Sequence, residues 1–376
     1  MKQQIKQIGK SLLMKLHSYK QLKFYKKLCK MNAIPNRKVK GESEWIKKWN
    51  GLGIKPNPIY YRLFSKYIGN DVNIVPEDIC HDVIENILNP MRYAKYYADK
   101  NMFDKLLPEN SLPKTILRKM NGFYYSDKYE LLDLNESKFS ALLDGSGLYR
   151  IIIKPSVGGS SGVGVKLFKR LENGSWISYD EKEILSKDYL DKSYGKDFII
   201  QECVKQFDYI NQFNPTSINT LRLTLYRSVK DDSFHVPSAI IRIGGKGSVV
   251  DNAHAGGCYV GIFSDGTLDK KVLNQYGTVI TVFNGVDFTK EYRIPYWDNV
   301  VRFAKEIGKC IPHHRLLALD LMLDEYGNPK IIEFNCEYYS MWLFQFTASS
   351  AFGDFTDEII EYCREHLNEV EFTQYL

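Results

Sequence analysis

The sequence of 376 residues has no apolar run of the roughly 18–20 residues that a membrane-spanning helix needs. Its apolar stretches, such as Ile151–Ile153, are the size of a strand. No signal peptide is expected, because Lys10 and Lys15 interrupt the apolar positions near the N-terminus. There is also no internal repeat and no low-complexity linker. These absences leave a folded chain of two or three domain-sized units.

Cysteine pairs are missing as well. None of the seven cysteines is spaced from another as in a zinc site or a redox pair, and their number is odd. Reduced thiols and a cytoplasmic location are therefore expected.

Acidic residues are absent from residues 1–40, which carry eleven lysines and Arg37, a charge of +12. The whole chain has 51 basic and 45 acidic residues, so the remainder holds 39 basic residues and a net charge of −6. A mildly acidic body argues against nucleic acid as a partner.

The apolar residues of this basic leader recur near the helical period and predict one amphipathic helix over residues 2–31. The residues of the predicted stripe are Ile5, Ile8, Leu12, Leu16, Tyr19, Leu22 and Leu28. A basic amphipathic helix can lie on an anionic membrane, which would place the protein at the inner face of the membrane. The alternative is a helix that docks on its own domain with its lysines solvated. RNA binding is a weaker third alternative.

The rest of the chain predicts an α+β fold. Residues 41–110 are expected to be helical, with prolines at helix boundaries, and strands begin near residue 111. Helices are expected over residues 136–143, from Pro295 to about Lys309, and over 356–367. Turn-forming pairs predict antiparallel hairpins at Asn121-Gly122, Asn173-Gly174, Asp231-Asp232, Asp265-Gly266 and Gly327-Asn328.

A glycine-rich segment gives the first chemical signal. A predicted strand ends at Lys154, and a loop of small residues follows before a β-branched strand. Glycines let backbone N–H groups approach phosphate oxygens, serines add donors, and the lysine supplies a positive charge. The loop matches neither the Walker A pattern nor the dinucleotide fingerprint, and a plain glycine-rich hairpin is the alternative. The candidate phosphate-binding residues are Lys154, Gly158, Gly159, Ser160, Ser161, Gly162 and Val163.

A hairpin near the C-terminus gives the second signal. Its turn lies at residues 325–328, so Asp320 is expected opposite Glu333, with Asn335 on the same face because strand side chains alternate. Two adjacent carboxylates repel each other and need a cation between them, and their hard oxygen atoms suit Mg²⁺. The alternative, a solvated acidic hairpin, is weakened by apolar residues that flank all three.

The two signals, in this order, resemble the ATP-grasp superfamily. The resemblance covers roughly residues 90–370, and the segments 214–222, 250–252 and 255–257 are similar to its sugar-transfer-associated branch, found with cell-surface polysaccharide biosynthesis. It implies an ATP-grasp fold of two α+β subdomains that clamp ATP, preceded by a helical region. With the basic leader and the helical region, the expected domains are residues 1–40, 41–110 and 111–376, the last being the ATP-grasp domain, divided into about 111–205 and 206–376.

The resemblance also assigns roles to residues. Lys154 and the glycine-rich loop would cover the phosphates of ATP, and Asp320, Glu333 and Asn335 would bind two Mg²⁺ ions. The end of the strand at 198–204 would contact adenine through Gln201, Glu202, Cys203 and Val204, and Asp208 would bind ribose. An earlier lysine would lie under the phosphates, and Lys105 is ranked above Lys100.

The implied reaction is the activation of a carboxylate as an acylphosphate, followed by its transfer to an amine or another nucleophile, with a small-molecule or sugar-linked acceptor. Arg222 is the first candidate for the transferring phosphate, with Asn219 beside it, and Arg242 and His254 are further catalytic candidates. Two rivals stay open: a kinase that phosphorylates a hydroxyl, and a weakly active nucleotide-binding partner of a membrane glycosyltransferase complex.

Overall fold

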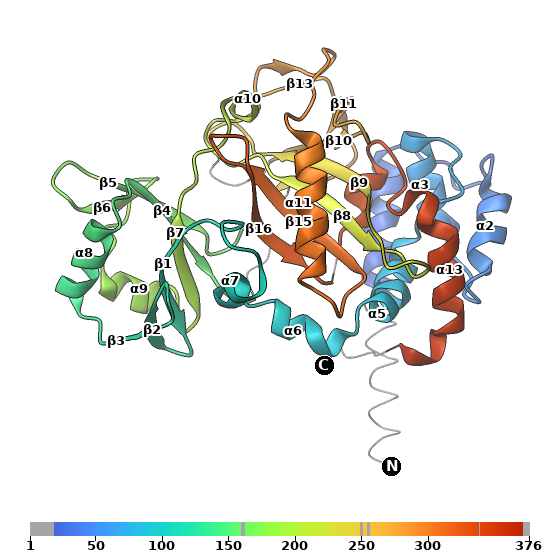
Figure 1. The fold of residues 1–376 in the computed structure, drawn as a ribbon. Helices are drawn as coiled ribbons and strands as arrows, with labels where there is room; N and C mark the ends of the chain where they lie inside the picture. Colours follow the sequence, from blue (N-terminus) through green and yellow to red (C-terminus); the bar gives the residue numbers. More distant parts are fainter. Residues whose placement is uncertain (1–18, 159–161, 249–250, 254–255, 338, 371–376) are drawn as a thin grey trace.

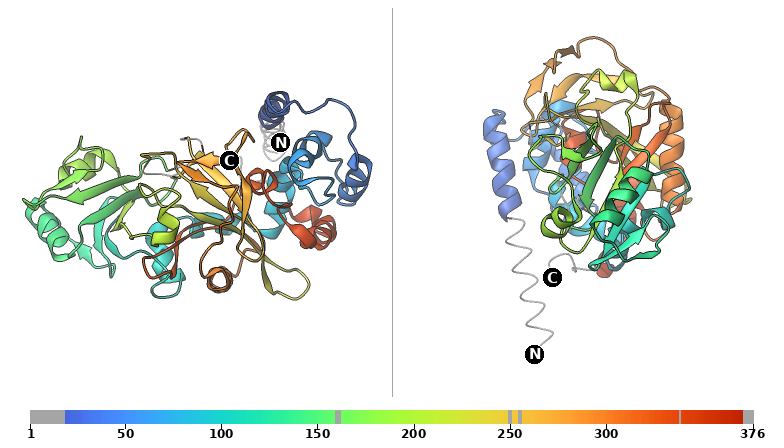
Figure 2. Two further views of the ribbon diagram at one scale, coloured as in Figure 1. Left: turned by 90° about the horizontal axis from the view of Figure 1, so that it is seen from above. Right: turned by 90° about the vertical axis from the view of Figure 1, so that its left-hand side faces the viewer.

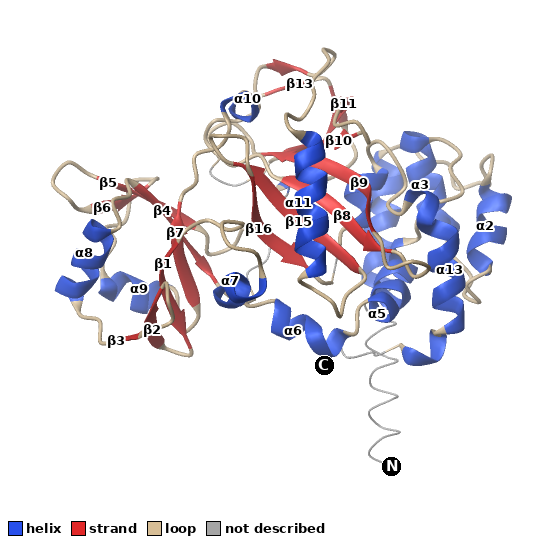
Figure 3. Cartoon of the chain, in the orientation of Figure 1, coloured by secondary structure: helices blue, strands red, loops and turns tan. Residues whose placement is uncertain are grey.

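The computed structural model describes residues 19–158, 162–248, 251–253, 256–337 and 339–370. Two antiparallel sheets with helices outside them form the fold, and a helical region packs against the second sheet (Figures 1 and 3). The architecture is the α+β fold that the sequence predicts.

The first sheet, at the left of Figure 1, has the strand order β3-β2-β1-β7-β4-β5-β6. Helices α8 and α9 cover one of its faces, over a core that includes Phe139, Leu190 and Ile153. The predicted hairpins at 121–122 and 173–174 join β1 to β2 and β5 to β6. The elements are β1 (Thr115–Met120), β2 (Phe123–Ser126), β3 (Leu131–Leu132), α8 (Glu136–Gly145), β4 (Arg150–Pro155), β5 (Lys166–Arg170), β6 (Trp176–Ser178), α9 (Lys187–Ser193) and β7 (Phe198–Glu202).

The second sheet has the order β12-β11-β10-β9-β8-β15-β16, and the short pair β13–β14 stands apart from it. The hairpins at 231–232, 265–266 and 327–328 are confirmed. The elements are α10 (Asp208–Asn211), β8 (Leu221–Arg227), β9 (Phe234–Ile243), β10 (Cys258–Ile262), β11 (Leu268–Leu273), β12 (Val279–Ile280), β13 (Val282–Phe283), β14 (Val286–Asp287), α11 (Trp297–Lys309), β15 (Leu316–Leu323), β16 (Pro329–Asn335), α12 (Met341–Gln345) and α13 (Thr356–Glu365).

Strand β15 is buried along its whole length, and its alternating side chains enter two different cores. Leu317, Leu319 and Leu321 pack with α11 on one face of the sheet. Leu316 and Ala318 pack on the other face with α12, α13 and the N-terminal helices. Asp320 continues this second face, so the candidate metal site lies at the edge of the surface that the N-terminal helices cover.

The N-terminal region is helical, as predicted. It carries a π-helical turn at Cys80–Ile84 between two short α-helices. Aromatic residues such as Trp45, Tyr60 and Phe64 fill its core. The elements are α2 (Glu42–Asn50), α3 (Pro58–Ile68), α4 (Glu77–Ile79), α5 (Glu85–Leu88), α6 (Ala94–Tyr97) and α7 (Phe103–Leu106).

The described part of the basic leader, residues 19–31, is helical and docks on this region (Figure 2). Tyr25 and Leu28 are buried, and the Tyr25 ring lies 4.7 Å from that of Tyr60 and 6.1 Å from that of Phe64. The apolar stripe predicted for the leader helix omits Tyr25, which is buried, and includes Tyr19, which is 66% exposed. For residues 19–31 the structure agrees with the alternative of a helix that docks on its own domain, and the lysines of this helix are exposed. Residues 2–18 lie outside the described part.

No helix among the described residues combines the length and the apolarity that crossing a bilayer requires.

The docked leader gives a stability prediction. Replacement of Tyr25 by alanine should lower the free energy of unfolding by about 3–4 kcal/mol, because it empties a site between two aromatic rings. The neighbouring Phe24→Ala is the control, since Phe24 is 41% exposed, and it should cost less than about 1 kcal/mol. Urea unfolding of both variants measures the difference. Equal losses would mean that the leader does not dock through Tyr25.

Candidate functional site

A cavity of about 330 Å³ lies between the two sheets. Strands β4 and β5 of the first sheet form one wall, and the hairpin β15–β16 with Arg242 of β9 forms the other. The connection at 203–220 and residues 251–252 close its ends. The cavity therefore joins the two segments that the sequence singled out.

The first wall depends on the alternation of β4. Ile151 and Ile153 point into the core under the helices, whereas Ile152 and Lys154 line the cavity. Val165 and Leu167 extend this apolar surface, and Ile332 faces it from the hairpin. An apolar slot with a cation at its end suits a ligand that has a flat ring and a charged tail.

The glycine-rich loop returns to β5 against Pro155. Gly164 has a φ of +78°, and a Cβ atom there would lie 2.8 Å from Cγ of Pro155. Only glycine satisfies both constraints without a shift of the loop. Gly162 and Val163 line the cavity.

Lys154 is buried, and no ion pair holds its ammonium group within the described residues. Burial, together with the charge of Lys100, lowers the pKa of Lys154 to about 8, and Glu333 opposes this shift. A buried, weakly compensated cation that faces a cavity is typical of a site for an anion.

The second wall is a row of charges across three strands. Arg222 of β8 lies opposite Asp320 of β15, and Asp320 lies opposite Glu333 of β16, as the sequence predicted for the last pair. Nε and Nη2 of Arg222 each lie 2.7 Å from a carboxylate oxygen of Asp320. Nζ of Lys100 lies 2.8 Å from Oε1 of Glu333. Each of the two carboxylates is thus neutralised by a cation.

Arg242 joins the row from β9. Its Nη1 lies 3.5 Å from Asp320, and its Nη2 lies 3.0 Å from Asp251. Burial raises the pKa of the Asp320 carboxyl, but the attraction of Arg222, Arg242 and Lys100 outweighs it, so this pKa lies below its usual value. Asp320 is therefore ionised at neutral pH.

The β15–β16 hairpin has a bulge next to Glu333. The register shifts by one residue after Asp320, and the extra residue in β16 is Ile332, which lines the cavity. Bulges of this kind bend a strand locally and often lie beside functional sites.

The hairpin carries two carboxylates that line the cavity, and the amide of Asn335, which lies two residues beyond Glu333 on the same strand and does not belong to the lining. Nδ2 of Asn335 is buried without a hydrogen-bond partner. Because the oxygen and nitrogen of an amide can exchange places by a flip of the side chain, the oxygen can take this position and bind a ligand there. Hard oxygen donors suit Mg²⁺. Within the described ranges, no group of three or more His, Cys, Asp or Glu side chains could hold a metal, so Asn335 is needed to complete the set.

Of the predicted adenine contacts, some line the cavity and others do not. Cys203 and Val204 line the cavity. Gln201 and Glu202 do not: Nε2 of Gln201 donates to the Pro113 carbonyl oxygen, and Glu202 accepts from the N–H of Lys114.

Three other parts of the nucleotide prediction have different outcomes. Asp208 is exposed at the start of α10 and does not line the cavity, so nothing in the geometry favours it as the ribose contact. Gly158 also lies outside the lining, and residues 159–161 lie outside the described part of the chain.

Of the two early lysines proposed to lie under the phosphates, the structure favours Lys100 over Lys105. Lys100 lines the cavity and contacts Glu333, whereas Nζ of Lys105 lies 4.1 Å from the centre of the Tyr129 ring, away from it. The short helical turn after Asp99, whose carboxylate accepts from the N–H of Asn101, sets the direction of Lys100.

The predicted catalytic residues are also divided. Asn219 is buried in the connection, where its amide donates to the Ile210 and Asn214 carbonyl oxygens, so it does not face the cavity. Arg222 stands behind Asp320 and is absent from the lining, whereas Arg242 belongs to it. His254 lies outside the described residues.

The polar end of the cavity is formed by residues of the segments 214–222 and 250–252 to which the sequence assigned no individual role. Asn214 shapes this end: its amide donates to Ser217 Oγ and accepts from the N–H of Thr216. Ser217, Thr216, Thr220 and Asp251 all line the cavity. The density of hydroxyl and amide side chains between 211 and 220 was the available signal.

The family model described as sugar-transfer associated ATP-grasp matches residues 81–358. The chain belongs to this family. No curated protein sequence matches it significantly. The match to the ATP-grasp family thus begins in the π-helical turn that carries His81 and ends within α13.

Three solved structures show a distant likeness to this ATP-grasp protein. A D-cycloserine synthetase is 13% identical, with 74% of this chain and 73% of the other covered and a TM-score of 0.40. The D-alanine–D-alanine ligase of Bacillus anthracis is 17% identical, with 72% and 66% covered and a TM-score of 0.38. The L-amino acid ligase of Bacillus licheniformis is 12% identical, with 72% and 48% covered and a TM-score of 0.38. These values carry no argument about activity.

The buried Lys154 predicts a pH-dependent cost of folding. The pKa of Lys154 in the folded protein, about 8, lies below the ordinary lysine value of 10.5, so charging it in the folded state costs about 3 kcal/mol. The cost is complete below pH 8 and fades as pH rises toward 10.5. Replacement by methionine should therefore raise the melting temperature at pH 7, and the gain should shrink at pH 10.

The control is Lys169→Met on the neighbouring strand, where Lys169 pairs with the exposed Glu181 at 2.6 Å. It should change stability by less than about 1 kcal/mol. Melting temperatures of both variants at the two pH values measure the effect. A destabilised Lys154→Met at pH 7 would contradict a weakly compensated charge.

Proposed function

We propose that this protein is an ATP- and Mg²⁺-dependent ligase, which activates a carboxylate as an acylphosphate and joins it to an amine or another nucleophile. One observation carries the proposal: the cavity sets an apolar slot and the cation Lys154 directly opposite the paired carboxylates Asp320 and Glu333. The family description, which refers to sugar transfer, supports a role in the biosynthesis or modification of cell-surface polysaccharide.

The residues of the cavity supply binding and charge compensation. Ile152, Val165 and Leu167 would hold the adenine ring, with Cys203 and Val204 at its edge. Lys154 and Lys100 would neutralise the phosphates. Bound Mg²⁺ would supply charge stabilisation at the β- and γ-phosphates, held by Asp320, Glu333 and Asn335.

The proposed reaction has two steps. A carboxylate oxygen of the donor forms a bond to the γ-phosphorus while the bond to the β-phosphate oxygen breaks, which releases ADP. The nucleophile then attacks the carbonyl carbon of the acylphosphate, and inorganic phosphate leaves. Arg242, which reaches the cavity beside Asp320, would hold the transferring phosphoryl group.

The polar end of the cavity would bind the acceptor. Ser217, Thr216 and Thr220 offer hydroxyl groups there, and Asp251 offers a carboxylate. Hydroxyl and carboxylate side chains suit a small-molecule or sugar-linked acceptor that carries several donors and acceptors.

Trapping with hydroxylamine tests the ligase against the kinase alternative. With Mg-ATP and a panel of amino acids, sugar acids and nucleotide sugars, the ligase should release ADP and form a hydroxamate, because hydroxylamine attacks an acylphosphate. A kinase would release ADP and form no hydroxamate. Absence of ADP release with the whole panel, together with intact ATP binding, would favour a weakly active binding protein.

Glu333→Gln is the decisive variant in the same assay. It is nearly isosteric, and it should lower ADP release by about 100-fold or more, because it removes a charge that positions the metal and Lys100. The control is Glu306→Gln on α11, whose carboxylate pairs with Lys309 at the surface. Turnover by Glu333→Gln equal to that of the control would reject the hairpin as the catalytic site.

Contact with an anionic membrane is a separate part of the proposal. The docked helix buries Tyr25 and Leu28 and leaves Tyr19, Phe24 and Met31 exposed beside its lysines, so the contact would be mainly electrostatic. The lysines of the described leader helix are Lys20, Lys23, Lys26, Lys27 and Lys30.

Vesicle sedimentation tests this contact. The protein should bind phosphatidylserine vesicles at low salt, dissociate at high salt and ignore neutral vesicles. Replacement of Lys23, Lys26 and Lys27 by glutamine should weaken binding by about 100-fold, at ~1 kcal/mol for each lysine. The control replaces three exposed lysines of the first subdomain, Lys138, Lys182 and Lys192. Equal weakening by both sets would show that the leader makes no specific contact.

A further inference from the structure

Four polar residues repeat at intervals of four along the segment that begins the family match: Glu77, His81, Glu85 and Asn89. The first three lie in α4, the π-helical turn and α5, and Asn89 is the extended residue that ends α5. All four residues of this polar stripe are buried, with exposed fractions of 2%, 6%, 0% and 0%. Buried polar groups are costly unless they are bonded. None of the four lines the cavity, so the proposed reaction does not account for them.

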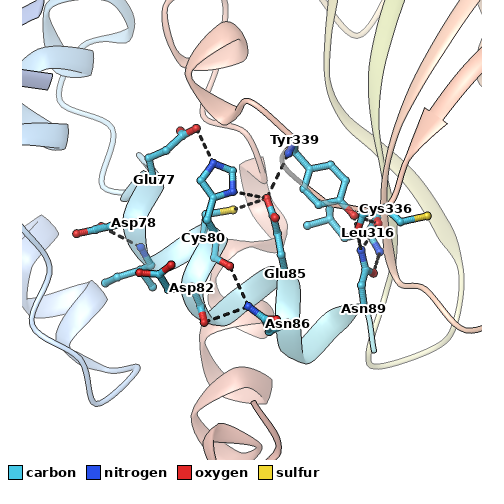
Figure 4. A network of polar contacts seen from close by, with 12 residues as sticks. Glu77, Asp78, Cys80, Asp82, Glu85, Asn86, Asn89, Leu316, Cys336 and Tyr339 are labelled. Carbon is cyan, nitrogen blue, oxygen red and sulfur yellow. Dashed lines mark hydrogen bonds and ion pairs between the residues drawn. The ribbon is translucent and has the colours of Figure 1, made fainter. Parts of the chain in front are cut away.

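The first three residues lock one another (Figure 4). Nδ1 of His81 lies 2.8 Å from Glu85 Oε1, and Nε2 lies 3.1 Å from Glu77 Oε1. A neutral imidazole has one N–H group and would turn a lone pair toward one carboxylate, so the contact with both favours the charged ring. The stripe thereby fixes the orientation of the Glu85 carboxylate.

The last two residues of the stripe reach the candidate metal hairpin. Nδ2 of Asn89 lies 2.7 Å from the Leu316 carbonyl oxygen and 2.8 Å from that of Cys336, and it also donates to the hydroxyl of Tyr339. Oδ1 of Asn89 accepts from the N–H of Leu316 at 3.0 Å. Glu85 Oε1 accepts from the N–H of Tyr339 at 3.3 Å.

These contacts lie at the open end of the hairpin. The last backbone pair of β15 and β16 is Ala318 with Asn335, and Leu316 and Cys336 lie beyond it. The amide of Asn89 bridges these two residues and takes the place of a further pair in the ladder. Its partner Cys336 follows Asn335 directly in the chain, whereas Asp320 is held independently by Arg222.

We propose that Asn89 is a positioning residue for Asn335, because it closes the open end of the β15–β16 hairpin, while Glu85 holds the chain at Tyr339. The inference rests on the proposed binding of Mg²⁺ by the hairpin. It assigns to the N-terminal helical region a part in forming the metal site, besides its part in the hydrophobic core.

Loss of the bridge that Asn89 forms should lower the affinity for Mg²⁺ more than the affinity for the nucleotide. Without Asn89 the strand ends separate, and the Asn335 amide loses its fixed position, while the apolar slot and Lys154 lie on the other wall of the cavity. Residues that orient a metal ligand typically change metal affinity by about 10–100-fold.

The experiment measures ADP affinity by calorimetry across a titration with MgCl₂. The wild type should bind ADP more tightly as Mg²⁺ rises. Asn89→Ala should need about 10-fold more Mg²⁺ for half of this gain, with an ADP affinity in the absence of Mg²⁺ within about twofold of the wild type. Asn335→Ala should show a similar shift.

Asn86→Ala is the matched control. Asn86 is buried in the same segment, and its amide donates to the His81 and Asp82 carbonyl oxygens at 3.0 and 3.2 Å, so it touches no part of the hairpin. It should lose stability without a change in the Mg²⁺ response. The double variant Asn89→Ala/Asn335→Ala should respond as Asn335→Ala alone does, because the two residues act through one ligand.

A normal Mg²⁺ response of Asn89→Ala, equal shifts in Asn86→Ala and Asn89→Ala, or an additive double variant would each overturn the inference. A wild type whose ADP affinity ignores Mg²⁺ would instead reject the proposed metal site. If Asn89→Ala fails to fold, Tyr339→Phe serves, since it removes only the hydroxyl that contacts Asn89 and the Leu316 carbonyl oxygen. It should shift the Mg²⁺ response in the same direction, and an unchanged response would overturn the inference.

Discussion

Two carboxylates on adjacent strands, Asp320 and Glu333, impose the constraint on which the rest of this site depends. Charges this close repel each other unless cations lie beside them. The fold supplies cations from three separate elements: Arg222 from β8, Arg242 from β9 and Lys100 from the turn before α7. The order β9-β8-β15-β16 brings the two arginines to Asp320, and any other neighbour for β15 would leave Asp320 without its bidentate partner.

The same strand also links the site to the body of the protein. Because side chains alternate, β15 presents Leu316 and Ala318 to the N-terminal helices and then Asp320 to the cavity on one continuous face. The helical region covers this face up to the edge of the cavity. A polar stripe within it bonds to the hairpin backbone, so packing and site geometry depend on the same segment.

The composition of the N-terminal leader is compatible both with a helix on a membrane surface and with a helix docked on its own domain. Lysines without acids make a helix suitable for an anionic surface, but an amphipathic stripe can equally bury itself in its own domain. In the described part the second outcome holds, because Tyr25 packs against Tyr60 and Phe64 of α3. Charge alone could not distinguish the two, since both leave the lysines exposed.

The sequence by itself determined the helical N-terminal region, three of the later helices, five hairpins and the pairing of Asp320 with Glu333, but not the helices α9, α10 and α12. Turn residues and alternating side chains are local signals, so they can be read without the fold. The sequence did not determine which long side chains reach the cavity. Lys100 and Lys105 lie five residues apart with similar surroundings in sequence, and only the docking of α7 directs one to Glu333 and the other to Tyr129.

Tertiary structure also decided the roles of polar residues in the connection between the sheets. Arg222 was the first catalytic candidate, with Asn219 beside it, but the loop uses the Asn219 amide for its own carbonyl oxygens, and Asp320 holds Arg222. The stripe of Glu77, His81, Glu85 and Asn89 is visible in the sequence as a repeat of four. Its meaning depends on contacts more than 220 residues away in the chain, such as that from Asn89 to Leu316. Such pairings depend on how the sheets and helices pack, and no local signal contains them.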